Sequence, residues 1–246
     1  PEFTDGTIQV APAGIAARDV RLWISDAATS LDGPLVFYWH GTGSQPLEAQ
    51  FGIGDPGLAA ILALGGMAAG PVHAPAAGQF PWFLTTGSGK EDDLIVADEI
   101  LACAIEKVGV DLRRVHSMGM SAGGLQTVQM SYRRSGYIAS VAPYSGGQIG
   151  TPPNQDPNNK FAAMIFHGGA SDQVIIGFQA ISEQYQSSLQ AEGHFAFLCD
   201  HGGGHTIPTD ARDSVSQFLQ AHPFGTTPSP YAGGLPSGFP SYCSLP

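Results

Sequence analysis

The stretch that decides the fold runs from Val115 to Gly124 and reads VHSMGMSAGG. It contains the pattern Gly-x-Ser-x-Gly, formed by Gly119, Ser121 and Gly123. In such a pattern a strand ends, the chain turns sharply at the serine, and a helix begins at once. Because the turning serine is strained, the residues two before and two after it must lack a Cβ. The pattern alone also fits an ordinary Gly/Ser turn, so the surrounding sequence has to discriminate.

The sequence on both sides of Ser121 has the order strand, turn, helix that the pattern requires. Residues 122–134 read as a helix, and the basic pair Arg133-Arg134 at its end suits the helix dipole. Residues 91–108 read as another helix, because apolar residues recur at helical spacing and acidic residues fill the first turn. Further helices are expected at 56–65, 174–192 and 209–221, and strands at 7–10, 20–25, 35–39, 68–74, 138–143, 161–167 and 194–199.

Strands that alternate with helices predict an α/β fold with a mostly parallel central sheet and helices on both faces. The run Leu35–Trp39 is continuously apolar, which is typical of a strand covered on both sides. We expect one catalytic domain over residues 1–246, without a large lid and with an irregular tail at 222–246.

The composition limits the kinds of partner. Charged residues make up only 13% of the chain, the net charge is -11, and the ten Lys and Arg are scattered. Nucleic acids and anionic membranes are bound by clusters of Lys and Arg, so neither is an expected partner. No run of eighteen apolar residues is present, so no membrane span is expected. Abundant Gly and Pro with few Lys and Glu are typical of a secreted protein, and a monomer is expected.

The three cysteines are Cys103, Cys199 and Cys243. They show no spacing typical of metal ligands, so neither a structural metal nor a cofactor is expected. A disulfide from Cys243 to either Cys103 or Cys199 would tether the tail, and three free thiols remain the alternative.

The sequence supplies candidates for nucleophilic catalysis. A serine hydroxyl needs a base within hydrogen-bond reach and a carboxylate that orients the base. In the α/β-hydrolase arrangement these groups follow in the order Ser, acid, His, each on a loop after a strand. Ser121, Asp172 and His205 fit that order.

Rival candidates for the acid are Asp200 and Asp210, and a rival base is His201. Asp200 shares a loop with the base, and Asp210 is explained as a helix cap. We prefer His205 because the preceding Gly202-Gly203-Gly204 allows a close approach. The histidines predicted to be structural hydrogen-bonding groups are His40, His116 and His167.

The negative charge that develops on a reacting carbonyl oxygen needs two N–H donors. One is the amide of Ala122, the first residue of the helix after Ser121. The second is expected in the loop after the 35–39 strand, at Thr42 with Gly43 as the alternative.

Four segments together resemble the polyhydroxybutyrate-depolymerase and feruloyl-esterase group of secreted α/β hydrolases. They are His40-Gly41-Thr42-Gly43, residues 111–124, His167-Gly168 with Asp172, and residues 203–208. The resemblance covers residues 35–221 and implies a secreted carboxylester hydrolase with the triad Ser121, Asp172 and His205. Ile207 is a departure, since that group often has Trp at this position.

The expected substrate is a polyester such as polyhydroxybutyrate or another bulky ester. Feruloyl or acetyl esters of plant polysaccharide are the alternative, and an inactive polymer- or carbohydrate-binding relative is the alternative of another class. The expected substrate-binding residues are Trp82, Gly43, Gln173 and Val174, with burial in the core as the alternative for Trp82.

Overall fold

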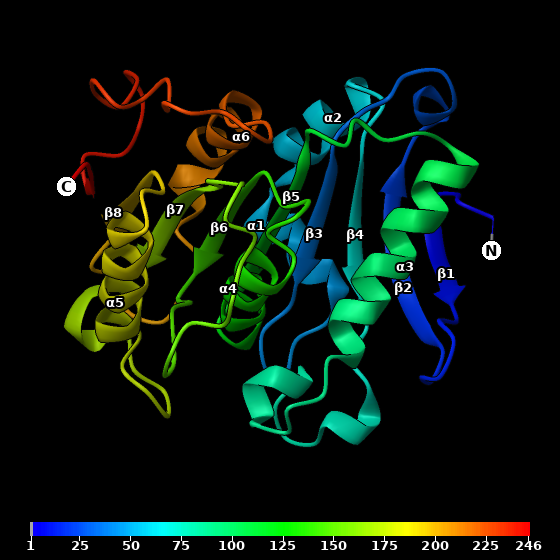
Figure 1. Cartoon of the computed structure of the whole chain (residues 1–246), viewed down its shortest axis with the longest axis horizontal. Helices are drawn as coiled ribbons and strands as arrows, with labels where there is room; N and C mark the ends of the chain where they lie inside the picture. Colours follow the sequence, from blue (N-terminus) through cyan, green and yellow to red (C-terminus); the bar gives the residue numbers. More distant parts are fainter. Residues whose placement is uncertain (1) are drawn as a thin grey trace.

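A computed structural model describes residues 2–246 of the chain. Within these residues the strands form a nine-stranded sheet in the order β1-β2-β4-β3-β5-β6-β7-β8-β9 (Figure 1). The strands from β4 to β8 run parallel, whereas β1, β2 and β9 are antiparallel to their neighbours. The bounds are β1 Gly6–Val10, β2 Arg18–Ile24, β3 Leu35–Trp39, β4 Met67–Pro71, β5 Val115–Met120, β6 Ser140–Tyr144, β7 Ala162–His167, β8 Ala196–Asp200 and β9 Cys243–Ser244.

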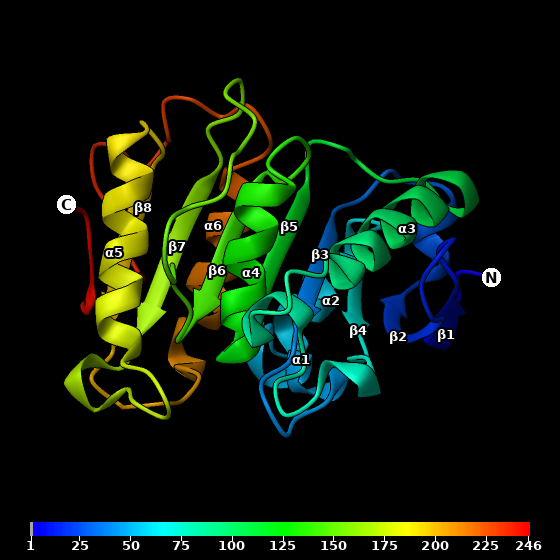
Figure 2. The same cartoon turned by 60° about the horizontal axis from the view of Figure 1, so that its bottom comes forward.

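Helices cover both faces of the sheet (Figures 1 and 2). One face carries α3, α4 and α5, and the other carries α1, α2 and α6. The helix bounds are α1 Ala49–Gly52, α2 Asp55–Ala63, α3 Asp92–Lys107, α4 Ala122–Arg133, α5 Phe178–Ala191 and α6 Arg212–Ala221. Short 3-10 turns lie at Asp26–Thr29, Pro46–Glu48, Pro75–Ala77, Phe83–Thr86, Gly169–Ser171 and Thr209–Ala211. This arrangement confirms the predicted α/β fold.

The strand β3 explains why the sheet has a hydrophobic core on each side. All five of its residues are buried, and successive side chains point to opposite faces of the strand. Leu35, Phe37 and Trp39 pack into the core beneath α3, α4 and α5. Val36 and Tyr38 pack into the second core, beneath α2 and α6. A run of five apolar residues is therefore needed here, as the sequence predicted.

Two predictions about the second half of the chain are corrected. The helix expected from residue 174 begins only at Phe178, because residues 173–177 fold back through a bridge between Gln173 and Gly177. The tail at 222–246 is not wholly irregular, since β9 pairs with the edge strand β8. A disulfide joins Cys199 to Cys243, and Cys103 is a buried free thiol.

The tail also packs against the body of the protein through aromatic side chains. Tyr231 lies against Phe218 and His222, and Phe239 lies against Phe197. These contacts extend the core beneath α6 and explain how a Pro- and Gly-rich segment is held. In residues 2–246, none of the helices is both long enough and apolar enough to cross a membrane.

Candidate active site

The turn between β5 and α4 places Ser121 in a strained backbone conformation. Its φ is 57° and its ψ is -119°, in a region that residues other than glycine rarely adopt. A Cβ on Gly123 would lie 1.8 Å from the carbonyl oxygen of Trp39, and one on Gly119 would lie 2.5 Å from the same atom. Both glycines are therefore required, because β3, β5 and α4 approach too closely for any side chain. This is the sharp strand–turn–helix geometry that the sequence pattern predicted.

The structure brings Ser121, His205 and Asp172 into one hydrogen-bonded chain. The Oγ of Ser121 lies 2.9 Å from Nε2 of His205, and Nδ1 of His205 lies 2.7 Å from Oδ1 of Asp172. The three residues follow β5, β8 and β7, whose carboxyl ends meet at one edge of the sheet. With Nδ1–H donated to the carboxylate, Nε2 is free to accept the hydroxyl proton of Ser121.

The carboxyl group of Asp172 is fully buried and has further donors. Its Oδ2 accepts hydrogen bonds from Ser145 Oγ at 2.8 Å and from the amide of Gly168 at 2.9 Å. Burial alone would raise the pKa of Asp172, but the bonds from His205, Gly168 and Ser145 outweigh it and lower the pKa. Asp172 is therefore held as the carboxylate beside the imidazole.

Ser145 and Phe178 are site residues that the sequence did not reveal. Ser145 follows β6 directly and, with Ser121, is one of two non-glycine residues with positive φ in the described chain. The ring of Phe178 lies 4.7 Å from that of His205, and the Phe178 amide donates to the carbonyl of Asp172. The position of Ser145 at the end of a buried strand was the available signal, but Ser145-Gly146-Gly147 reads as an ordinary turn.

The rival candidates for the acid and the base form hydrogen bonds with other groups. Asp200 accepts from the amide of Gly202 and is half exposed, and Asp210 accepts from the hydroxyl of Tyr242. The Nδ1 of His201 accepts from the amide of Gly203. His40, His116 and His167 are all buried in hydrogen bonds, as expected of structural histidines. Burial lowers the pKa of His40 to about 4 and that of His116 to about 3, so both are neutral at physiological pH.

The two expected oxyanion donors are the amides of Thr42 and Ala122. Thr42 and Ala122 line the same cavity as Ser121 and His205. Within residues 2–246 neither of these two amides donates a hydrogen bond to the protein. The loop that carries Thr42 lies against the turn at Ser121, since a Cβ on Gly41 would be 3.5 Å from the Cβ of Ser121. Gly43 does not line this cavity.

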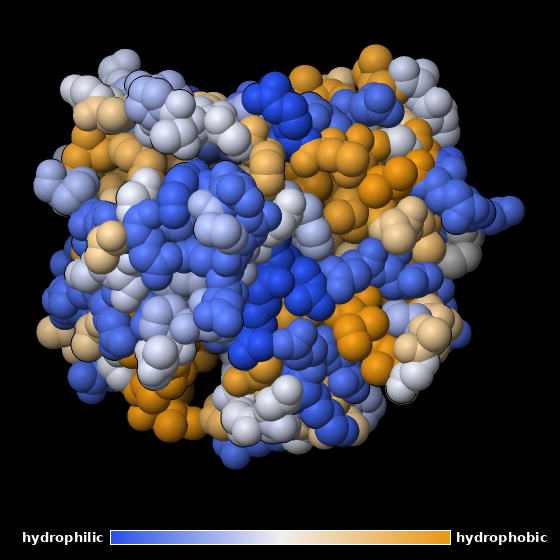
Figure 3. All heavy atoms as spheres, viewed as in Figure 1, coloured by the Kyte–Doolittle hydropathy of each residue, from blue (hydrophilic) through white to orange (hydrophobic). Residues whose placement is uncertain are grey.

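The cavity beside Ser121 has a volume of about 430 Å³ and mainly apolar walls. Val174 and Ile175 form part of its rim and are 65% and 68% exposed, and Ile149 is 56% exposed. Figure 3 shows apolar side chains gathered at the lower edge of the molecule, beneath α5 and next to a hollow. The other lining residues are Gln79, Phe80, Thr85, Leu125, Ile176 and Phe178.

Three of the residues expected to bind substrate do not line the cavity of Ser121: Gly43, Trp82 and Gln173. Trp82 is fully buried, with its ring 5.0 Å from that of Trp39 and its Nε1 donating to the carbonyl of His40. It offers no surface to a substrate, so that prediction is wrong and the alternative of core packing holds. Gln173 is exposed, but it lines a small pocket behind Asp172 and not the cavity of Ser121.

A second cavity contains neither Ser121 nor His205 in its lining. It has a volume of about 630 Å³ and includes Met120, Thr206 and Ile207, which adjoin Ser121 and His205 in the chain. Leu47 and Phe51, which are 45% and 62% exposed, form part of its wall, together with Ser44, Gln45, Glu48, Gln50 and Thr209.

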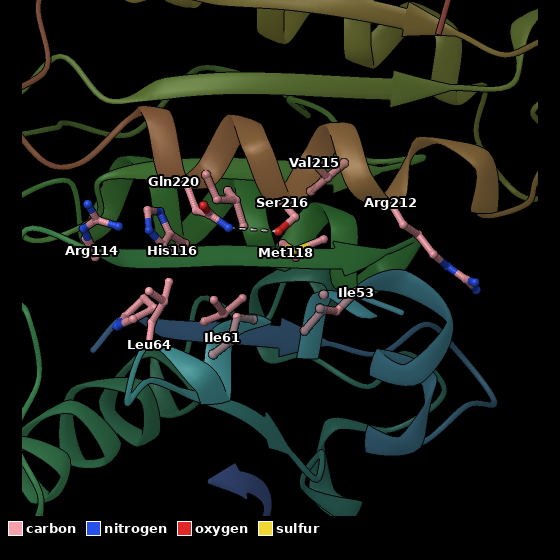
Figure 4. A pocket seen from close by; sticks show the side chains of 14 residues that line it. Ile53, Ile61, Leu64, Arg114, His116, Met118, Arg212, Val215, Ser216 and Gln220 are labelled. Carbon is pink, nitrogen blue, oxygen red and sulfur yellow. Dashed lines mark hydrogen bonds between the residues drawn. The ribbon is translucent and has the colours of Figure 1, made fainter. Parts of the chain in front are cut away.

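A third cavity lies between α2 and α6, and Figure 4 shows the residues that line it, among them Ile61, His116 and Val215. Its volume is about 30 Å³, which is about the space of one water molecule. Its lining includes neither Ser121 nor Asp172 nor His205. In residues 2–246 no three His, Cys, Asp or Glu side chains are grouped to hold a metal ion.

Several solved structures have a similar fold. The native crystal structure of pOPH superposes with a TM-score of 0.76 at 19% identity, covering 99% of this chain and 95% of that one. The fold is that of the α/β hydrolases. A ferulic acid esterase gives a TM-score of 0.64 at 15% identity, covering 87% of this chain and 96% of that one. Esterase PE8 gives a TM-score of 0.60 at 21% identity, covering 78% of this chain and 94% of that one.

These identities show a shared α/β-hydrolase fold and no closer relationship. No protein-family model matches this chain, and no curated protein sequence matches it. The esterases among the structural neighbours are nevertheless consistent with the resemblance read from the sequence.

Proposed function

We propose that this chain is a serine carboxylester hydrolase with Ser121 as nucleophile, His205 as base and Asp172 as the group that orients the base. The observation that carries this proposal is the unbroken hydrogen-bonded chain between the three side chains, next to the unpaired amides of Thr42 and Ala122. Each component of acyl transfer is then present at one cavity: nucleophile, base, orienting carboxylate and oxyanion donors.

In this mechanism Ser121 Oγ attacks the ester carbonyl while Nε2 of His205 takes the hydroxyl proton. The amides of Thr42 and Ala122 bind the oxyanion of the tetrahedral intermediate, and loss of one such donor costs about 3 kcal/mol of transition-state stabilisation. His205 then passes its proton to the leaving alkoxide. Water, activated by the same imidazole, releases the acid from Ser121, and the buried Asp172 stabilises the imidazolium at both steps.

The sizes of the two cavities and the apolar walls of the first support an ester with an apolar acyl group and a bulky alcohol portion. We place the acyl group in the 430 Å³ cavity, because it contains Ser121 and both oxyanion donors. The alcohol portion then faces the 630 Å³ cavity beyond Met120 and Ile207. Neither cavity is lined by Lys or Arg, so an anionic substrate is disfavoured. A polyester or another bulky ester fits this description, and a feruloyl ester is the second candidate because one structural neighbour is a ferulic acid esterase.

Secretion is also part of the proposal. The Cys199–Cys243 disulfide supports it, because disulfides persist in oxidising compartments and are rare in the cytosol.

The activity is tested by hydrolysis of p-nitrophenyl butyrate. The wild-type chain should turn over this ester, and Ser121→Ala should lower kcat at least a thousandfold while the protein remains folded. A Ser121→Ala variant with wild-type turnover would refute the proposal. Parallel assays on a solid polyester film and on methyl ferulate then separate the two substrate classes, since release of soluble acids from the film supports the first.

A further inference from the structure

We propose that Glu48 is a positioning residue that holds the oxyanion loop, defined as residues 40–44, in its active conformation. The inference rests on the proposed esterase function and adds a residue to its machinery. Glu48 ends the 3-10 turn Pro46–Glu48. It lies in the wall of the 630 Å³ cavity and outside the cavity that contains Ser121. It therefore acts on the loop and not on the substrate carbonyl.

The carboxylate of Glu48 binds the loop backbone directly. Its two oxygens accept the amide of Gly41 at 3.1 and 3.3 Å, and its Oε1 also accepts the hydroxyl of buried Tyr38 at 3.3 Å. A Cβ built on Gly41 would lie 3.5 Å from Glu48 Oε2 and 3.5 Å from the Cβ of Ser121. Gly41 thus lies close to both the Glu48 carboxylate and Ser121.

The hydrogen bond between Glu48 and the Gly41 amide matters because the next peptide group carries the Thr42 N–H. The carbonyl of Gly41 and the amide of Thr42 belong to one planar peptide, so the direction of the carbonyl sets the direction of the Thr42 N–H. That carbonyl accepts from His40 Nδ1 at 2.8 Å and from the amide of Ser44 at 3.1 Å. Glu48 fixes the preceding amide, so both peptide planes of Gly41 are held. The Thr42 N–H is left free at the cavity of Ser121.

The segment that carries Glu48 is itself anchored to the core. Tyr144 donates from its hydroxyl to the carbonyl of Gly52 at 2.9 Å, and Arg212 donates from Nε to the carbonyl of Phe51 at 2.6 Å. The ring of Tyr38 leaves no room for a side chain at Gly52. A rigid base for the carboxylate is what a positioning role requires, since a mobile acceptor would not fix Gly41.

The proposed role of Glu48 requires an oxygen that accepts the Gly41 amide. Two substitutions test whether this acceptor, and not the negative charge, is what matters. Glu48→Gln keeps an acceptor for the Gly41 amide at nearly the same size, whereas Glu48→Ala removes it. We expect Glu48→Ala to lower kcat for p-nitrophenyl butyrate about tenfold with little change in KM, because the oxyanion exists only in the transition state. We expect Glu48→Gln to retain at least half of kcat.

A trifluoromethyl ketone inhibitor gives a second readout, since it forms an anionic adduct on a serine nucleophile and occupies the oxyanion donors. Its Ki should weaken about tenfold in Glu48→Ala and stay near the wild-type value in Glu48→Gln. Glu106→Ala removes an exposed carboxylate on α3 and should match the wild type in both assays.

Three results would overturn the inference. Unchanged kcat and Ki in Glu48→Ala would show that the oxyanion loop keeps its conformation without Glu48. Equal losses in both Glu48 variants would show that the acceptor oxygen does not account for the loss of activity. A loss confined to KM would show a role in substrate binding. A wild-type chain that hydrolyses no ester would refute the proposed function as well, so the two failures are distinguishable.

Discussion

The amide of Gly204 donates a hydrogen bond of 3.0 Å to the carbonyl of Gly168. This bond joins the loop that carries His205 to the loop that carries Asp172. The two loops touch so closely that a Cβ on Gly168 would lie 2.0 Å from the carbonyl oxygen of Gly204. The relative position of base and acid therefore depends on backbone packing as well as on their own hydrogen bond.

Replacement of Gly168 by alanine should separate the two loops. The added methyl group cannot fit at 2.0 Å from a backbone oxygen, so the Asp172–His205 distance must increase. We expect kcat for p-nitrophenyl butyrate to fall at least tenfold and the melting temperature to fall by several degrees. Gly233→Ala is the matched control, since a Cβ there meets no atom within 4 Å. Wild-type kinetics in Gly168→Ala would contradict the close packing of the loops.

The lowered pKa of Asp172 predicts a specific dependence of stability on pH. Its pKa is lower in the folded chain than in the unfolded chain, so the ionised group stabilises the fold above the ordinary carboxyl pKa. That contribution is lost as the pH falls through the folded pKa. Between pH of about 5 and about 2, the free energy of unfolding should therefore decrease more steeply in the wild type than in Asp172→Asn. Urea unfolding across this range measures both curves, and parallel curves would contradict the assignment.

The Cys199–Cys243 disulfide should support both stability and catalysis. It holds β9 against β8, where the carbonyl of Tyr242 accepts the amide of Asp200 at 3.0 Å and the hydroxyl of Tyr242 donates to Asp210 at 2.9 Å. These contacts flank the loop that carries His205. Replacing both cysteines by alanine should lower the free energy of unfolding by about 3 kcal/mol. It should also reduce kcat several-fold.

Cys103→Ser is the control for the disulfide, because Cys103 is a free thiol on α3. It should keep the wild-type kcat. A double alanine variant as stable and as active as the wild type would show that the tail does not support the His205 loop.

The apolar rim formed by Val174 and Ile175 should determine the preference for acyl-chain length. Both side chains are largely exposed and border the cavity of Ser121. Changing both to serine removes apolar surface that a long acyl chain would cover, at about 25 cal/mol per Å². We expect KM for p-nitrophenyl octanoate to rise about fivefold and KM for p-nitrophenyl acetate to stay the same. Ile105→Ser, at a 47% exposed residue on α3, should change neither, and an equal effect on both esters would contradict the assignment.

The order of elements could be predicted because each strand and helix carries its own local pattern. Leu35–Trp39 reads as a strand covered on both faces, and its side chains enter both cores. The start of α5 could not be predicted. Residues 174–176 are apolar and continue the helical pattern, and only the pairing of Gln173 with Gly177 turns them into a loop. The sequence also does not determine the disulfide partner of Cys243, because the pairing depends on which edge of the sheet the tail reaches.

The candidate site was predictable where chain order carries the information. Ser121, Asp172 and His205 each follow a strand, and parallel strands bring their carboxyl ends together. Ser145, Phe178 and Glu48 could not be identified, because their contacts with the site arise only through tertiary packing. An aromatic residue in a Pro-rich loop, such as Trp82, resembles a binding surface in the sequence, but in the structure its indole N–H donates to the buried carbonyl of His40.

Covalent labelling tests the central claim, that Ser121 is an activated nucleophile. The wild-type chain is treated with a fluorophosphonate, and the modified residue is located by peptide mass spectrometry. We predict a single phosphonyl group on Ser121, and a rate of labelling that falls at least a hundredfold in His205→Ala, where the base is missing. An unlabelled wild-type chain, or an adduct on any residue other than Ser121, would contradict the account.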